Sequence, residues 1–241
     1  MSNLKNVEAF NGLIGICTGY GGAYSPGSSN LRIESLLELL NQARHALRQV
    51  SLSKTGYESA TNAREVKFME IRKLASRILA ELRSSGVLPQ TVADAAAMVR
   101  KMKGRVKAEK PEATSQVESS LPVVYRPRVN GSDFESVVYH FEKLIATLEA
   151  EPKYAPGVAG LKLEALQQQV GELRAANQAV VNAINAWHMA RSERDALLYT
   201  GAESVHKRAM AVKQQLKAIF GYDSDAVEAA SRIVLTYQTP K

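Results

Sequence analysis

The sequence predicts an all-α fold, an elongated helical bundle with long antiparallel coiled-coil-like helices in two similar halves. Two observations lead to this prediction. The chain has 241 residues, of which 45% are hydrophobic and 23% charged, so it has enough apolar material for a core. Apolar residues recur at steps of three and four over most of its length, which is the spacing of one face of a helix.

Residues 1–30 are an exception to this helical pattern. They hold six of the fifteen glycines, together with Pro26 and several serines, and show no sustained helical period. We therefore expect a flexible, glycine-rich N-terminal arm. Tyr20 and Tyr24 give this arm aromatic anchors, which we expect to contact a neighbouring subunit in an oligomer.

A first helical half is expected over residues 31–103. Its apolar stripes predict three helices, at about 31–50, 57–84 and 90–103. In the second of these helices the stripe is narrow, as in a coiled coil. This seam consists of Phe68, Ile71, Ala75, Ile78 and Leu82.

Residues 104–130 break the helical pattern. Pro111, Pro122 and Pro127 fall here with several Ser and Thr residues, so we expect a basic, proline-containing linker or an extended crossover. The apolar piece Leu121–Tyr125 is a candidate for a short strand.

A second helical half is expected over residues 131–241. A Ser-x-x-Glu capping box at Ser132 starts its first helix. The helices that follow are predicted at about 160–199, 202–219 and 225–234. Asn177 falls on the apolar seam of the long helix, where a polar residue either fixes the register of packing partners or faces solvent through a twist of the helix.

The two halves resemble each other in sequence. Ile33–Leu37 matches Phe134–Val138 at a separation of 101 residues, and Leu79–Leu82 matches Leu216–Ile219. We therefore predict an internal duplication. The pattern leaves open whether the halves pack as one bundle or as two domains.

Three parts of the second half have a recognisable sequence. They are Glu151–Pro156 with Leu161–Leu163, Ala190–Asp195 with Leu197–Tyr199, and Phe220–Ser224. These parts resemble a group of uncharacterised all-helical bacterial proteins of unknown function, mainly over residues 132–235. The resemblance implies a helical architecture, and it implies no activity and no catalytic or binding residue.

The positive charge of the chain is concentrated in one segment. There are 31 Lys and Arg residues against 24 Asp and Glu, a formal net charge of +7. Residues 100–128 contain eight basic and three acidic residues, and so contribute +5 of that total. The eight are Arg100, Lys101, Lys103, Arg105, Lys107, Lys110, Arg126 and Arg128. They favour a phosphate-binding patch, or they simply complement the dipole at a helix C-terminus.

No catalytic residue, cofactor or metal site is predicted. The single cysteine, Cys17, excludes an intramolecular disulfide and a multi-cysteine metal site. One Glu-x-x-His pair occurs, Glu203 with His206, without the second copy that a di-metal site in a helical bundle needs. Gly19–Gly22 lacks the preceding strand and the Lys-Ser or Lys-Thr of a phosphate-binding loop. We expect a protein that is not an enzyme.

The expected function is that of a non-enzymatic structural or protein–protein interaction protein. It would form a homo-oligomer, or bind a helical partner protein, through the N-terminal arm and the helical seams. The alternative is sequence-independent nucleic-acid binding through the basic segment 100–128. A third interpretation, a membrane-active protein, lacks a long apolar hairpin. Residues 1–23 do not have the pattern of a signal peptide, and no stretch is apolar enough to span a bilayer, so we expect a cytoplasmic protein.

Overall fold

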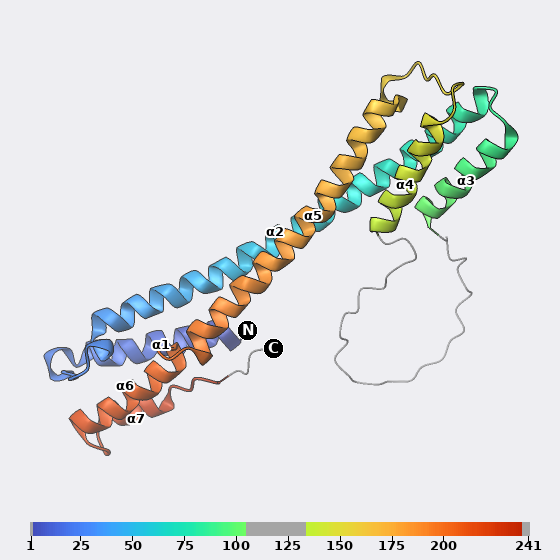
Figure 1. Cartoon of the computed structure of the whole chain (residues 1–241). Helices are drawn as coiled ribbons and strands as arrows, with labels where there is room; N and C mark the ends of the chain where they lie inside the picture. Colours follow the sequence, from blue (N-terminus) through green and yellow to red (C-terminus); the bar gives the residue numbers. More distant parts are fainter. Residues whose placement is uncertain (1, 105–133, 238–241) are drawn as a thin grey trace, which may run out of the picture. The chain divides into compact units, whose positions relative to one another are not determined.

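The structure is a computed structural model that describes residues 2–104 and 134–237 (Figure 1). These residues form seven α-helices and no strand, which confirms the all-α prediction. The helices are α1 (Ser2–Gly19), α2 (Ile33–Ser84), α3 (Pro89–Lys103), α4 (Phe134–Glu149), α5 (Leu163–Asp195), α6 (Val205–Phe220) and α7 (Asp225–Arg232). The strand predicted at Leu121–Tyr125, and nearly all of the predicted linker, lie outside the described residues.

The chain packs as two compact units, which are not the two predicted halves. Unit 1 comprises residues 1–58 and 182–241, and unit 2 comprises residues 59–181. The helices α2 and α5 each contribute one part to unit 1 and the other part to unit 2. Each unit therefore combines helices from both halves of the sequence.

The prediction of a flexible arm over residues 1–30 is wrong. Residues 2–19 form α1, which contributes apolar side chains to the core of unit 1. These side chains are Val7, Phe10, Leu13, Ile14 and Cys17. Gly12, Gly15 and Gly19 all lie on the exposed side of α1, so they weaken the helical signal in the sequence without interrupting the buried face.

The helices predicted at 31–50 and 57–84 are one continuous helix, α2, of 52 residues. The serines, Thr55 and Gly56 between the two predicted helices are typical of a turn. In the structure the helix itself satisfies one of these side chains, because the Thr55 hydroxyl donates to the Ser51 carbonyl at 3.2 Å. The predicted seam is confirmed as core, since its five residues, Phe68 to Leu82, are all buried in unit 2.

Two segments of similar sequence lead into the long helices. Strap 1 (Tyr24–Leu31) precedes α2 and strap 2 (Tyr154–Leu161) precedes α5, and both read Tyr-x-Pro-Gly-x-x-x-Leu. In each strap the Tyr hydroxyl donates to the Leu carbonyl, at 3.0 Å in strap 1 and 2.8 Å in strap 2. Each strap also ends in one turn of 3₁₀-helix.

The straps give a different register for the likeness between the halves. They correspond at a separation of 130 residues, not 101. The match at 101 pairs the start of α2, which follows a strap, with the start of α4, which precedes one, so the structure does not support that register.

The long helix predicted at about 160–199 is α5 followed by a π-helix, Ala196–Thr200. Gly201 closes the π-helix by donating its N–H to the Ala196 carbonyl at 2.8 Å. The helices predicted at 90–103, 202–219 and 225–234 are confirmed as α3, α6 and α7, within a few residues at their ends. Ser204 caps α6 and Ser224 caps α7.

Candidate functional site

The predicted basic segment enters the described residues at the end of α3 in unit 2. Arg100, Lys101 and Lys103 lie in the last turn of this helix, and all three are exposed. Met102 between them is fully buried, and the Arg72 side chain donates to its carbonyl at 3.1 Å. This packing fixes the turn that carries the cations. Arg105, Lys107, Lys110, Arg126 and Arg128 lie outside the described residues.

Helix α4 adds further groups at the same end of unit 2, because it packs against α3. His140 on α4 has a pKa below its ordinary value, first because it is partly desolvated and then because of the charges of Lys101 and Lys143. Lys101 of α3 and Lys143 of α4 therefore both lie close enough to act on one imidazole. We call this set the cationic surface; it consists of Arg100, Lys101, Lys103, His140 and Lys143.

An exposed aromatic ring adjoins the cationic surface. Tyr139 is 51% exposed, and its ring centroid lies 4.7 Å from Lys143 Nζ and 5.3 Å from the His140 ring. An exposed ring among cations is the combination with which proteins stack bases and hold the phosphates of single-stranded nucleic acid.

Two carboxylates on α4 and α5 are paired with cations outside this surface. Glu142 pairs with Arg174 at 2.6 Å, and Glu172 pairs with Lys67 at 2.9 Å. Within the described residues, no carboxylate forms an ion pair with the lysines or arginines of the cationic surface.

Asn177, the polar residue on the predicted seam of the long helix, is buried. Its amide donates to the Glu135 carboxylate on α4 at 2.7 Å, and its carbonyl oxygen has no hydrogen-bond partner among the described residues. The interpretation in which it faces solvent is therefore wrong. Asn177 joins α5 to the first turn of α4.

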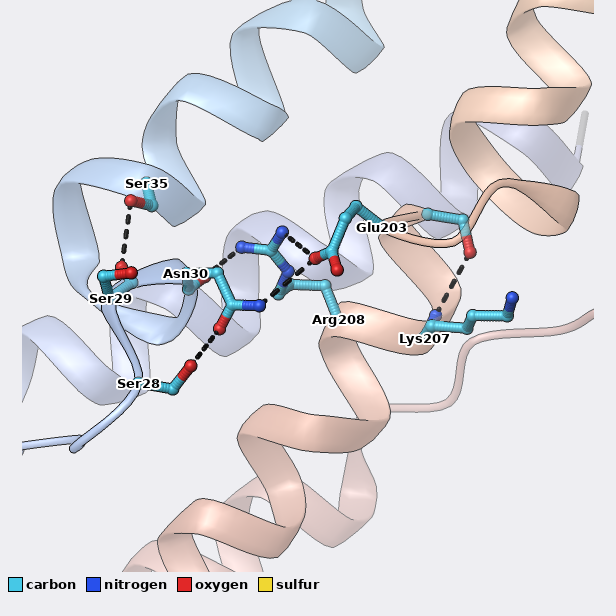
Figure 2. A network of polar contacts seen from close by, with 8 residues as sticks. Ser28, Ser29, Asn30, Ser35, Glu203, Lys207 and Arg208 are labelled. Atoms are coloured by element: carbon cyan, nitrogen blue, oxygen red, sulfur yellow. Dashed lines mark hydrogen bonds and ion pairs between the residues drawn. The ribbon is translucent and has the colours of Figure 1, made fainter.

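A second polar site lies in unit 1, where strap 1 meets the start of α6 (Figure 2). The Arg208 guanidinium donates to the Asn30 carbonyl and to the Glu203 carboxylate, and the Asn30 amide donates to the same carboxylate at 3.2 Å. The Ser28 hydroxyl donates to Asn30 Oδ1 at 2.6 Å. An open cavity of about 340 Å³ borders this network. Because Glu203 neutralises the largely buried Arg208, the network fastens strap 1 to α6, and the charge of Arg208 is already paired within it.

Both tyrosines predicted as oligomer contacts make contacts within unit 1. Tyr24 is 5% exposed and bonded to Leu31 within strap 1, so the prediction for this residue is wrong. Tyr20 is partly exposed, and its ring packs against Phe220 of α6 with centroids 4.7 Å apart. Both rings hold the α1–α2 connection in place.

The candidate nucleophile and metal ligands do not assemble into a site. Cys17 is fully buried beside Tyr24, and burial raises the pKa of its thiol. Of the Glu-x-x-His pair, Glu203 is bound to Arg208, while the His206 ring packs on Tyr237. Within residues 2–104 and 134–237, no group of three His, Cys, Asp or Glu side chains is placed to hold a metal ion.

The basic run in the sequence predicted the α3 residues of the cationic surface, but not His140 and Lys143 of α4. Tyr139 and Lys143 are four residues apart on a predicted helix, which is a usable signal for a shared face. Their position next to Lys101 depends on the packing of α3 against α4, for which the sequence carries no marker.

The helices of the described residues contain no apolar stretch long enough to cross a membrane. Comparisons of the chain with protein-family models, with curated proteins and with solved structures found no match.

Proposed function

We propose that the chain is a non-enzymatic protein that binds nucleic acid without sequence preference, through the cationic surface of unit 2 and the basic residues that follow α3. One observation supports this proposal above the others. Cations from two helices, Lys101 and Lys143, act on His140 beside the exposed ring of Tyr139, and no carboxylate of the described residues is paired with them.

The physical basis is counterion release. Phosphates that replace the small ions around Lys and Arg side chains give an affinity that falls steeply with salt, by a slope close to the number of phosphates contacted. No ion pair within the described residues has to break before these cations contact phosphate. The Tyr139 ring adds stacking, which favours single strands over duplexes.

The test is a fluorescence anisotropy titration of a labelled single-stranded oligonucleotide with the full-length protein and two triple variants. The first variant combines Arg100→Gln, Lys101→Gln and Lys103→Gln. The matched control removes the same charge from exposed positions of unit 1, by Lys5→Gln, Arg48→Gln and Lys207→Gln. We expect the first variant to bind at least about tenfold more weakly and to lose about two units of salt slope, with the control close to wild type.

Two results would contradict this proposal. Equal losses in both triple variants would mean that net charge alone draws the oligonucleotide to the protein. An absence of binding by the wild-type protein at about 50 mM salt, where such contacts are strong, would exclude the function altogether.

The second candidate function is that of a structural protein that associates with a second copy or with a helical partner. The seam residues and Tyr24, on which that expectation was based, are buried within the units, so they support packing inside the chain. The candidate is favoured by a different feature, the docked C-terminal segment described below. Light scattering after size-exclusion chromatography over a range of concentrations tests it, and a monomer at every concentration would contradict it.

We also propose that the two halves of the sequence are duplicates in the register of the straps. Besides the straps, the buried faces of α1 and α4 support a duplication. Val7, Phe10, Leu13, Ile14 and Cys17 correspond in order to Val138, Phe141, Leu144, Ile145 and Leu148 at a separation of 131 residues, so the connection from α1 to strap 1 is one residue longer than the connection from α4 to strap 2. All ten side chains are buried, in unit 1 and unit 2 respectively.

A further inference from the structure

The C-terminal segment Ile233–Tyr237 is held on unit 1 by the side chain of Asn6. Asn6 lies on α1 and is 4% exposed. Its amide donates to the Thr236 carbonyl at 2.7 Å, and its carbonyl oxygen accepts from the Thr236 N–H at 2.9 Å. One buried side chain thus satisfies both backbone groups of one residue, as a neighbouring strand would.

The side chains of this segment alternate between the core and solvent. Leu235 is buried in the core of unit 1 and Ile233 packs against it, whereas Val234 is 73% exposed. Ile233 packs close to α1 at Gly12, where an added Cβ would lie in ordinary van der Waals contact, 3.5 Å from Ile233 Cδ1. The Lys213 ammonium donates to the Ile233 carbonyl. Backbone hydrogen bonds with alternate side chains in pockets are the usual means of recognising an extended peptide.

The end of the segment meets an aromatic contact. The Tyr237 ring packs edge-on against Tyr199, with centroids 5.8 Å apart, and against His206 at 5.3 Å. The Tyr199 hydroxyl also accepts a hydrogen bond from Asn6 at 2.9 Å and donates to Asn3 at 2.6 Å. Asn6 is therefore oriented for its contact with Thr236 by the fold itself.

We infer that this face of unit 1 is a docking groove for an extended segment with the pattern Ile-x-Leu-x-Tyr, and that it accepts this segment from a second copy of the chain as well as from its own. The segment begins directly after α7, which ends at Arg232, so its release unfolds no helix. The groove is specific for its occupant, because Asn6 and Lys213 hold the backbone while the buried position of Leu235 and the contact of Tyr237 with Tyr199 fix the side-chain register. The inference deepens the second candidate function, since it names the contact through which two copies associate.

A competition experiment on the full-length protein tests the inference. The probe is a fluorescent peptide with the sequence of residues 230–241, and the protein carries Leu235→Ala with Tyr237→Ala to weaken its own segment. We expect the peptide to bind this double variant at least about tenfold more tightly than wild type, because the wild-type groove is occupied. A peptide with Asp in place of Leu235 is the matched control and should not bind.

The role of the backbone contacts is tested by adding Asn6→Ala or Lys213→Gln to the double variant. Each addition should weaken peptide binding by about tenfold or more, the loss of a hydrogen bond to a buried partner. Should Asn6→Ala lose its helical circular dichroism, Lys213→Gln at a partly exposed position still gives the answer. Equal peptide affinity for wild type and double variant, or no binding to either, would overturn the inference. Nucleic-acid affinity should stay unchanged in all of these variants. A failure of the docking groove can therefore be distinguished from a failure of the proposed nucleic-acid binding.

Discussion

Gly201 shows how closely single residues are fitted at the end of the π-helix in unit 1. A Cβ at this position would lie 2.7 Å from the Ala196 carbonyl oxygen, a distance that real Cβ atoms do not tolerate. The backbone angle φ of Gly201 is −58°, which any residue adopts, so the restriction is steric. The Ala196 carbonyl also accepts the Gly201 N–H, and it therefore has no freedom to move away.

We expect Gly201→Ala to lower the free energy of unfolding of unit 1 by about 1–3 kcal/mol, the usual effect of overpacking. Urea titration followed by the fluorescence of Trp187, the only tryptophan in the chain and a residue of unit 1, measures this change. The control is Gly15→Ala on the exposed side of α1, where no atom lies within 4 Å of the added Cβ. It should instead stabilise by roughly 0.5–1 kcal/mol through helix propensity. Equal effects of the same sign would contradict the steric explanation.

Tyr139 is the residue that separates stacking from simple charge attraction. We expect Tyr139→Ala to weaken single-stranded binding by about 1–3 kcal/mol while it leaves the slope against salt unchanged, because no cation is lost. Tyr139→Phe keeps the ring and should bind like wild type. A loss that is equally large for duplex DNA would argue against stacking.

At the scale of elements, the two straps place one buried tyrosine before each long helix. Burial, followed by the charge of Glu81, raises the pKa of Tyr154 to about 12. Burial also raises the pKa of Tyr24, to which the neighbouring Cys17 contributes. Both hydroxyls are needed in their neutral form, since each donates its proton to a leucine carbonyl.

The raised pKa gives the strap contact a defined pH dependence. A folded-state pKa above the ordinary value of 10 contributes stability that is complete below about pH 10 and is lost as the pH rises through about 12. We expect Tyr154→Phe to cost about 1 kcal/mol at pH 8, where the hydrogen bond is intact. This difference from wild type should shrink steadily between about pH 10 and 12, as measured by urea titration with circular dichroism. A constant difference would contradict the proposed role of the hydroxyl.

The sequence predicted best the helices whose buried and exposed faces differ most in hydrophobicity. The apolar stripes of α3, α6 and α7 predicted these helices to within a few residues. The prediction failed for α1 because its glycines lie on the exposed face, where they lower propensity but leave the core unchanged. It failed at Ser51–Gly56 because local propensity favours a turn there, while the helix on either side continues through it.

At the scale of the whole molecule, α2 and α5 are each divided between the two compact units. This division was not predictable from hydrophobic periodicity. A helix has the same spacing of apolar residues whichever unit the residues that pack against it belong to. The Tyr-x-Pro-Gly pattern of the straps was present in the sequence and supports the register that we propose for the two halves. The basic segment was likewise visible, but its meeting with Lys143, His140 and Tyr139 depends on long-range packing.

The cationic surface also makes a prediction about protons. Phosphate bound there would offset the charges of Lys101 and Lys143, so the lowered pKa of His140 should rise on binding. Binding therefore takes up a proton, and affinity should increase as the pH falls from about 7 to about 6.

The most direct test is an NMR titration of the His140 imidazole, free and saturated with an oligonucleotide. In the free protein the pKa should lie below 6.5, and Lys101→Gln should raise it. In the complex the pKa of His140 should rise, and the triple control variant in unit 1 should show the same rise. An unchanged His140 pKa in a saturated complex would show that nucleic acid binds elsewhere, and would contradict the account.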